Sequence, residues 1–111
     1  EVQADRLGAV QELQARYGGV IVLKGTGTLI TDGARCRLST AGNPGMASGG
    51  MGDVLTGVIA GLCAQGPPPA EAAAVGVLLH GLAGDAAAQA GGERGLLAAD
   101  LLPELRRLMN A

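Results

Sequence analysis

The stretch that organises this chain is Asn43-Pro44-Gly45-Met46-Ala47-Ser48-Gly49-Gly50-Met51-Gly52-Asp53-Val54-Leu55-Thr56-Gly57. Its glycine-rich first part lets the backbone turn tightly and lets another group approach closely. At Asp53 an apolar pattern of helical spacing takes over, which predicts a heavily buried helix over residues 52–65. The sequence therefore places a glycine-rich loop directly before the first turn of a helix.

This helix start can bind an anion. The first turn of a helix has N–H groups without partners inside the helix, and the aligned peptide dipoles add partial positive charge there. An anion hole can form from the backbone of Gly49, Gly50, Met51 and Gly52. Our central hypothesis is that the loop binds phosphoryl oxygens, while Asp53 contacts the group that receives or loses them. The alternative is that Asp53 only caps its helix, although a cap does not require the flanking glycines.

Upstream of this stretch the sequence follows the rhythm of an α/β fold. Residues 4–17 carry apolar side chains at helical spacing, and Gly18-Gly19 ends the predicted helix. Val20-Ile21-Val22-Leu23 is a continuous apolar run, which fits a strand buried on both faces in a parallel sheet. A helix followed by a buried strand predicts the α/β class, with helices on both sides of a sheet.

Directly after the predicted strand comes Lys24-Gly25-Thr26-Gly27-Thr28. Ligands of open α/β sheets bind outside the carboxyl ends of the strands. A lysine, two hydroxyl groups and two glycines at such an end can contact an anionic ligand. The alternative is an ordinary turn that opens with a solvated lysine.

The rest of the chain is predicted to be one hairpin and two further helices. The hairpin spans residues 29–38 and turns at Asp32-Gly33, a strong turn signal. One helix runs from about residue 69 to 90, and the last runs over 101–109 with an inner stripe. That stripe consists of Leu101, Leu102, Leu105, Leu108 and Met109.

Four further polar or sulfur-containing residues are interpreted as structural. We expect His80 to be a packing residue in the middle of its helix and Asp85 to be a polar edge of the same helix. Cys36 and Cys63 have no metal-ligand spacing, so we expect both to be small apolar core or near-core residues in a reducing cytosol.

Composition excludes several classes of function. The 111 residues carry a net charge of −2 and contain one aromatic residue, so no basic stripe with stacking aromatics is available for nucleic acid. The longest apolar run is interrupted and too short to span a bilayer. The sequence matches neither the P-loop nor the dinucleotide fingerprint, and it shows no catalytic triad or metal-ligand cluster. A phosphate cradle with one carboxylate remains, which fits phosphoryl transfer.

These residues resemble a known family. The Lys24–Thr28 motif followed by the Asn43–Gly57 motif is similar to the C-terminal half of ADP-dependent NAD(P)H-hydrate dehydratase, and so is Leu79-His80-Gly81-Leu82-Ala83-Gly84-Asp85. The resemblance covers about residues 5–108, and the long glycine motif is the specific part. It implies a ribokinase-like three-layer αβα sandwich of which residues 1–111 are the C-terminal portion of a single nucleotide-binding domain. It also implies that the N-terminal half, with further substrate contacts, is not in this sequence.

The resemblance implies a repair reaction on damaged coenzyme. Hydrated NADH or NADPH is phosphorylated by ADP on the added hydroxyl, and phosphate then leaves, which gives AMP, phosphate and NAD(P)H. Mg²⁺ is implied, held largely through phosphates and water. The protein is also expected to be cytoplasmic and to form a homo-oligomer. Its activity is expected to need the N-terminal half of the domain. By the family pattern, Asp53 contacts the hydrated nucleotide, and the adenine nucleotide contacts Lys24, Gly25, Thr26, Gly27, Thr28 and Gly52.

Two rival functions stay open at this point. One is a ribokinase-like kinase of a small alcohol such as a thiazole or pyrimidine, whose product keeps the phosphate. The other is a non-catalytic nucleotide-binding fragment, which the short length makes credible.

Overall fold

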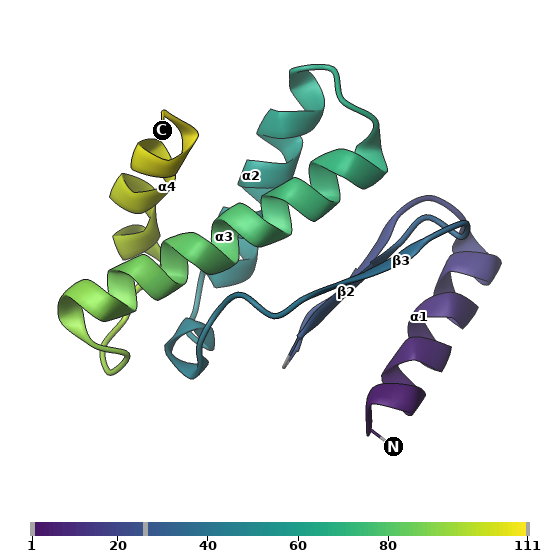
Figure 1. Cartoon of the computed structure of the whole chain (residues 1–111), viewed down its shortest axis with the longest axis horizontal. Helices are drawn as coiled ribbons and strands as arrows, with labels where there is room; N and C mark the ends of the chain where they lie inside the picture. Colours follow the sequence, from purple (N-terminus) through teal and green to yellow (C-terminus); the bar gives the residue numbers. More distant parts are fainter. Residues whose placement is uncertain (1, 26, 111) are drawn as a thin grey trace.

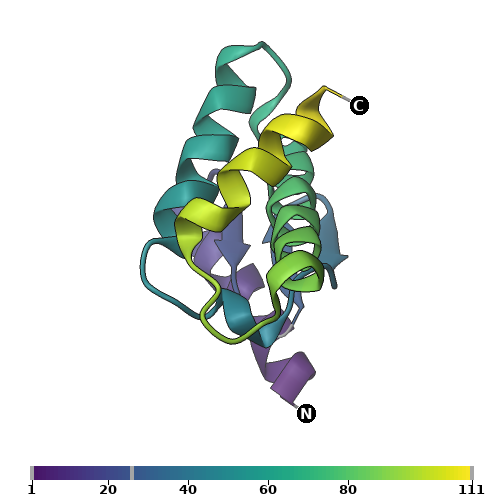
Figure 2. The same cartoon turned by 90° about the vertical axis from the view of Figure 1, so that its left-hand side faces the viewer.

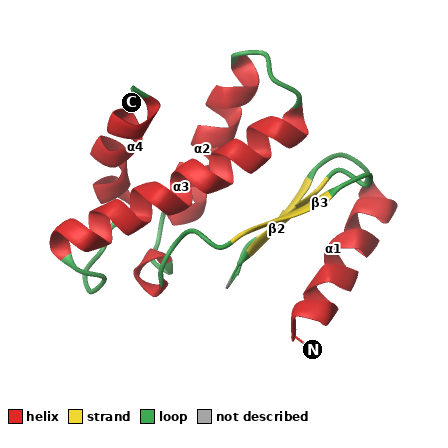
Figure 3. Cartoon of the chain, viewed as in Figure 1, coloured by secondary structure: helices red, strands yellow, loops and turns green. Residues whose placement is uncertain are grey.

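The computed structural model describes residues 2–25 and 27–110, with side chains from Arg6 onward. Figure 3 shows helices on either side of a small sheet. The elements in chain order are α1 (Val2–Tyr17), β1 (Ile21–Leu23), β2 (Thr28–Thr31), β3 (Cys36–Ser39), the 3₁₀ turn η1 (Pro44–Met46), α2 (Met51–Ala64), α3 (Pro69–Gly91), the 3₁₀ turn η2 (Ala98–Asp100) and α4 (Leu101–Met109).

The elements form layers, with α1 on one face of the sheet and α2 and α3 on the other (Figure 1). Successive side chains of β2 lie on opposite faces of the sheet, because the residues of a strand point alternately in opposite directions. Ile30 packs with Val22 against Leu55 of α2 and Val77 of α3. The neighbouring Leu29 is also buried, on the face of α1. The predicted α/β class, with helices on both sides of the sheet, is confirmed.

The strand pairing differs from the expected parallel arrangement. The described strands form one sheet in the order β1-β2-β3, and both pairings are antiparallel. The connection between β1 and β2 is only residues 24–27. A parallel pair needs a crossover of about a dozen residues or more, so this short link requires an antiparallel partner.

The hairpin turns where the sequence predicts. Gly33 has a φ of 95°, and the Asp32 carboxylate accepts hydrogen bonds from the amides of Ala34 and Arg35, both at 3.0 Å. These bonds, that of Arg35 first, hold the pKa of Asp32 below its usual value. The alternation of Arg35 and Arg37 with Cys36 and Leu38 predicts one solvated and one apolar face on β3; the apolar face is wrong, because Leu38 is 55% exposed.

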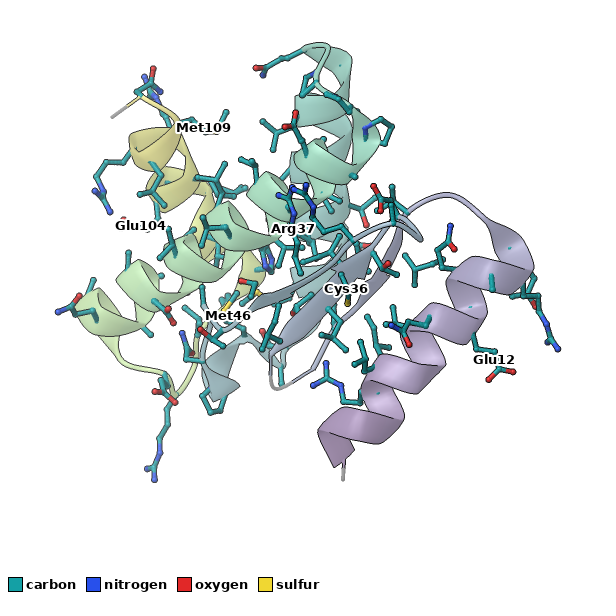
Figure 4. All side chains as sticks on the ribbon, turned by 45° about the vertical axis from the view of Figure 1, so that its right-hand side comes forward. Glu12, Cys36, Arg37, Met46, Glu104 and Met109 are labelled. Atoms are coloured by element: carbon teal, nitrogen blue, oxygen red, sulfur yellow. The ribbon has the colours of Figure 1, made fainter. Side chains whose placement is uncertain are left out.

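The two cysteines are also outside the core. Both Cys36, on β3 (Figure 4), and Cys63, on α2, are free and exposed. The prediction of core or near-core thiols is therefore wrong. Apolar spacing placed each residue on an element that packs, but each lies on a face that no neighbour within the described residues covers.

Helix α2 begins and ends within one residue of its prediction, but it is less buried than expected. Of its described residues, only Met51 and Leu55 are buried. Gly57 and Gly61 face open space within the described part of the chain. The small face of this helix therefore has no neighbour here, and the helix packs through the opposite face.

Helices α2, α3 and α4 share one apolar cluster. Met51, Ala83, Ala87, Leu101 and Leu105 form its centre together with Leu96. In Figure 2, α4 crosses in front of α2 and α3, with the sheet behind them. None of the helices in residues 2–25 and 27–110 combines the length and apolar character that a membrane crossing requires.

The predicted stripe of α4 is half right. Leu101 and Leu105 are buried, whereas Leu102 and Met109 are 55% and 46% exposed. Asp100 directly precedes α4, at the position from which it could cap that helix. Its carboxylate instead accepts a hydrogen bond from the Leu97 amide at 2.9 Å, which caps η2.

His80 ties α3 to the first turn of α2, and its predicted packing role agrees with this position. Its side chain is only 4% exposed, and Nε2 lies 3.0 Å from the carbonyl oxygen of Met51. Because a carbonyl can only accept, Nε2 carries the proton and donates it. Burial and then the charge of Lys24 lower the pKa of His80 below 6.5, against a smaller opposing effect of the bond to Met51. His80 is therefore neutral in the folded protein near pH 7.

We expect the stability of the fold to fall as the pH drops below about 6.5, the usual pKa of histidine. The unfolded chain takes up a proton at His80 there, while the folded chain resists it, so protonation favours unfolding. His80→Gln can still donate a hydrogen bond to Met51 and does not titrate. Thermal unfolding from about pH 8 to about pH 5 should show a shallower acid-side loss of stability in His80→Gln than in the parent. Parallel pH profiles for the two proteins would contradict this assignment.

Candidate functional site

A cavity of about 510 Å³ lies at the carboxyl end of β1. This volume is within the usual range of small-molecule sites. Four residues predicted to bind nucleotide line it, namely Lys24, Gly25, Gly27 and Thr28. Thr26, predicted with them, lies outside the described residues. The rest of the wall comes from residues 40–44, 46 and 47, and from Leu55, Val77 and His80.

Arg6 of α1 fixes the loop that follows β1. Its guanidinium donates hydrogen bonds to the carbonyl oxygens of Leu23, at 3.4 Å, and of Gly27. A Cβ added at Gly25 would lie 2.9 Å from Nη2 of Arg6, so a side chain there would require the guanidinium to shift. The helical pattern of residues 4–17 places Arg6 off the apolar face and predicts no contact for it. A lone basic residue on a helix gives no signal that it will reach the loop after the next strand.

The start of α2 has the geometry of an open anion seat. Gly50 precedes the helix with a φ of 87°, a conformation that glycine adopts without strain. Within residues 2–25 and 27–110, the amides of Gly52 and Asp53 donate to no acceptor. Gly49, Gly50 and Gly52 are exposed, whereas the Met51 side chain is buried, so only the backbone of Met51 is available to a ligand.

Asp53 is exposed in the first turn of α2, but it does not cap the helix. The cap position is Gly50, and no side chain makes a capping bond there. The capping alternative for Asp53 is therefore wrong, because the helix begins two residues before it. In the described part of the chain its carboxylate has no hydrogen-bond partner. It is free to accept a hydrogen bond from a ligand.

The Lys24–Thr28 motif and the glycine-rich start of α2 are neighbours in the structure, but they do not line the same cavity. Gly49–Asp53 do not line the cavity around Lys24. Two residues connect the regions: Leu55, one turn after Met51, lines the cavity, and His80 both lines it and bonds to the Met51 carbonyl. The cavity and the start of α2 are therefore neighbours that share these two buried residues.

One part of the site was missed from the sequence. We define the 40–47 loop as residues 40–47, which include η1 and form half of the residues lining the cavity. This loop is bonded to Asp85 of α3, which we had interpreted as a polar edge. The available signal was Gly81, Gly84 and Asp85 on one helix face, because two glycines permit a close neighbour for the carboxylate to bond.

The chemistry of the site is that of anion binding. Lys24 supplies a cation, Thr28 and Thr40 supply hydroxyl groups, and the start of α2 supplies unpartnered amides. Among the residues that the structure describes, no three His, Cys, Asp or Glu side chains come together as a metal site. Such a set can hold and position a polyphosphate, with Asp53 as the acceptor beside it.

Comparisons with known proteins point to one family. The sequence model of the NAD(P)H-hydrate dehydratase family matches residues 1–107. A bifunctional NAD(P)H-hydrate repair enzyme of Vibrio cholerae is 59% identical over 110 residues, which cover 99% of this chain and 22% of that enzyme. This chain thus spans less than a quarter of the length of that relative.

Solved structures show the fold. The ADP/ATP-dependent NAD(P)H-hydrate dehydratase of Bacillus subtilis, co-crystallized with ATP and Mg²⁺, matches with a TM-score of 0.90 and 35% identity. The match covers 99% of this chain and 40% of that one. A ribokinase-like superfamily protein of Enterococcus faecalis matches with a TM-score of 0.80 and 41% identity over 90% of this chain and 34% of its own. The fold is ribokinase-like, and the chain belongs to the NAD(P)H-hydrate dehydratase family.

Proposed function

We propose that this chain serves the ADP-dependent dehydration of hydrated NADH and NADPH. The observation that carries the proposal is the cavity beside Lys24 together with the amides of Gly52 and Asp53 at the adjacent helix start, which donate to no acceptor among the described residues. Family membership supports the same reaction. We also propose that residues 1–111 are the C-terminal portion of one ribokinase-like nucleotide-binding domain, since they align with 40% of the Bacillus subtilis enzyme.

The described residues suit an adenine nucleotide. The cavity of about 510 Å³ can take the base and ribose, and Lys24 offers a cation to a phosphate. We propose that Gly25, Thr26, Gly27, Thr28 and Gly52 also contact the nucleotide, and that Gly49–Gly52 form the anion hole for its transferable phosphate. Bound Mg²⁺ would neutralise phosphate charge and reach the site through phosphates and water, which is common for this ion.

Asp53 is proposed to orient the substrate. Its exposed carboxylate can accept a hydrogen bond from the hydroxyl of the hydrated nicotinamide and aim that oxygen at the phosphorus atom. That oxygen bonds to the terminal phosphorus as the P–O bond to the rest of the nucleotide breaks, and the hydroxyl proton is lost to water. The C–O bond then breaks and phosphate leaves with its electron pair, while loss of a ring proton restores the double bond. The nucleotide donor becomes AMP when it starts as ADP. In this proposal the site promotes phosphoryl transfer by positioning the hydroxyl and by stabilising the charge of the phosphate.

A direct assay tests the proposed reaction. We expect the domain completed by its N-terminal portion, with ADP and Mg²⁺, to restore the absorbance of reduced nicotinamide when hydrated NADH is added, and to release inorganic phosphate. Recovery should require the nucleotide, because phosphorylation makes the hydroxyl a good leaving group. Transfer of phosphate to an alcohol without recovery of the absorbance would favour a small-molecule kinase. Tight ADP binding with neither reaction would favour a non-catalytic nucleotide-binding function.

We expect Asp53→Asn to lower turnover by about 100- to 10 000-fold while ADP affinity stays near that of the parent. The amide still fits the helix start but accepts and aims a hydroxyl less well. Glu71→Gln is the matched control, because Glu71 is an acid in the first turn of α3. Turnover is measured by the absorbance assay and ADP affinity by calorimetry. Equal turnover of Asp53→Asn and the parent would remove Asp53 from the mechanism.

We further propose a cytoplasmic homo-oligomer. The free thiols Cys36 and Cys63 suit a reducing compartment. On α3, Val75, Leu78 and Leu82 recur on one face and are 46%, 46% and 40% exposed, which is costly for a monomer in water.

We expect sedimentation to show the chain as larger than a monomer, since association would bury this apolar face of α3. Leu78→Glu should reduce the size, because a charge there opposes burial. Leu97→Glu is the control, since Leu97 is 61% exposed and does not belong to α3. A compact parent monomer with a cooperative melt would contradict self-association.

A further inference from the structure

One face of α3 is shaped to receive the 40–47 loop. A Cβ added at Gly81 would lie 2.7 Å from the Ala41 Cβ and 2.8 Å from the Ala41 carbonyl oxygen, and one at Gly84 would overlap the sulfur of Met46. Figure 4 shows Met46 next to α3. The two glycines are one helical turn apart, so the loop lies directly on the helix backbone. Asp85 follows at the next position, where its side chain meets the loop.

Both carboxylate oxygens of Asp85 accept hydrogen bonds from this loop. One oxygen accepts from the Gly42 amide at 3.0 Å, and the other accepts from Nδ2 of Asn43 at 2.9 Å. Oδ1 of Asn43 in turn accepts from the Gly45 amide at 3.0 Å and so caps η1. The three bonds form a relay from α3 to the turn, and they fix which way the Asn43 amide points.

We propose that Asp85 is a positioning residue for nucleotide binding: through Gly42 and Asn43 it holds the 40–47 loop in the shape that forms one wall of the cavity. This inference rests on the proposed function, because it takes the cavity as the nucleotide site. The loop contributes half of the lining residues, so a shift of the loop changes the cavity more than a shift of any single side chain.

The geometry argues against a direct role of this carboxylate on the ligand. Asp85 is half-buried and does not line the cavity, whereas Asn43 does. A bare carboxylate there would repel phosphate, but both oxygens of Asp85 are engaged by donors from the loop. Its effect on a nucleotide therefore passes through the backbone of the loop.

Hydrogen-bond direction gives a sharp test. In Asp85→Asn the new NH₂ group faces the NH₂ group of Asn43, and flipping Asn43 would bring its NH₂ against the Gly45 amide. One of the three bonds is therefore lost in either orientation. In the exchange variant, which combines Asn43→Asp with Asp85→Asn, all three bonds return. The amide introduced on α3 accepts from Gly42 and donates to the carboxylate introduced on the loop, which also accepts from Gly45.

The experiment measures ADP affinity by calorimetry and the exchange of the Gly42 and Gly45 amides by NMR, on the parent chain and these variants. We expect Asp85→Asn to weaken ADP binding about tenfold or more, because a bond to a charged group is lost, and to speed exchange at both amides. The exchange variant should restore slow exchange of both amides, whereas its ADP affinity should stay below that of the parent, because the carboxylate introduced at residue 43 lines the cavity and repels phosphate. Asp32→Asn is the matched control, since the Asp32 carboxylate also accepts two backbone amides but lies in a turn that does not line the cavity, and its ADP affinity should equal that of the parent.

Each other result overturns the inference. ADP affinity of Asp85→Asn equal to the parent would remove the positioning role while the nucleotide site stands. Failure of the exchange variant to restore amide protection would show that the relay does not hold the loop. A parent that does not bind ADP would overturn the nucleotide proposal and this inference with it. If Asp85→Asn does not fold, Asn43→Ala loses the bonds to Asp85 and to the Gly45 amide; it should weaken ADP binding and speed exchange of the Gly45 amide, while the Gly42 amide keeps its bond to Asp85.

Discussion

Close approach of neighbouring segments to the backbone of helix α3 is the constraint on which the candidate site depends. Its Gly81 and Gly84 admit the 40–47 loop to backbone distance, and His80 bonds to the first residue of α2. Gly76 admits Ile59 of α2 in the same way, because a Cβ there would lie 2.7 Å from the Ile59 side chain. The helix therefore lacks side chains where its neighbours arrive. A methyl group at these positions would separate the elements that form the cavity.

The charges of the site are separated by these contacts. Lys24 lies on the cavity wall, where an anion can reach it, and its charge helps keep the buried imidazole of His80 neutral. The carboxylate of Asp85 is turned into the loop and engaged by two donors. Asp53 remains as the exposed acid beside the open amides of α2. Donors and one cation therefore face the ligand, which is the arrangement that phosphoryl oxygens require.

Apolar spacing proved a better guide to the existence of elements than to their burial. It located α2, α3 and α4 within a residue or two, and the turn chemistry of Asp32-Gly33 located the hairpin. It overstated the burial of α2 and of the Leu102 and Met109 positions, because spacing identifies a face that can pack but not whether a neighbour reaches it. The antiparallel pairing of β1 follows from the short connection 24–27, which is visible in the sequence. The apolar run Val20–Leu23 alone suggests a parallel strand and does not carry this information.

The sequence by itself determined the local features of this protein: the helices, the hairpin, the glycine-rich start of α2 and the family, because each is encoded by residues close together in the chain. Only the tertiary structure decided that Arg6 holds the loop after β1 and that Asp85 holds the 40–47 loop. Arg6 and Gly27 are 21 residues apart, and Gly42 and Asp85 are 43 residues apart. The structure also decided that Asp53 is not a cap. Such contacts depend on how layers pack, and no short pattern records which polar side chain will meet which distant backbone group.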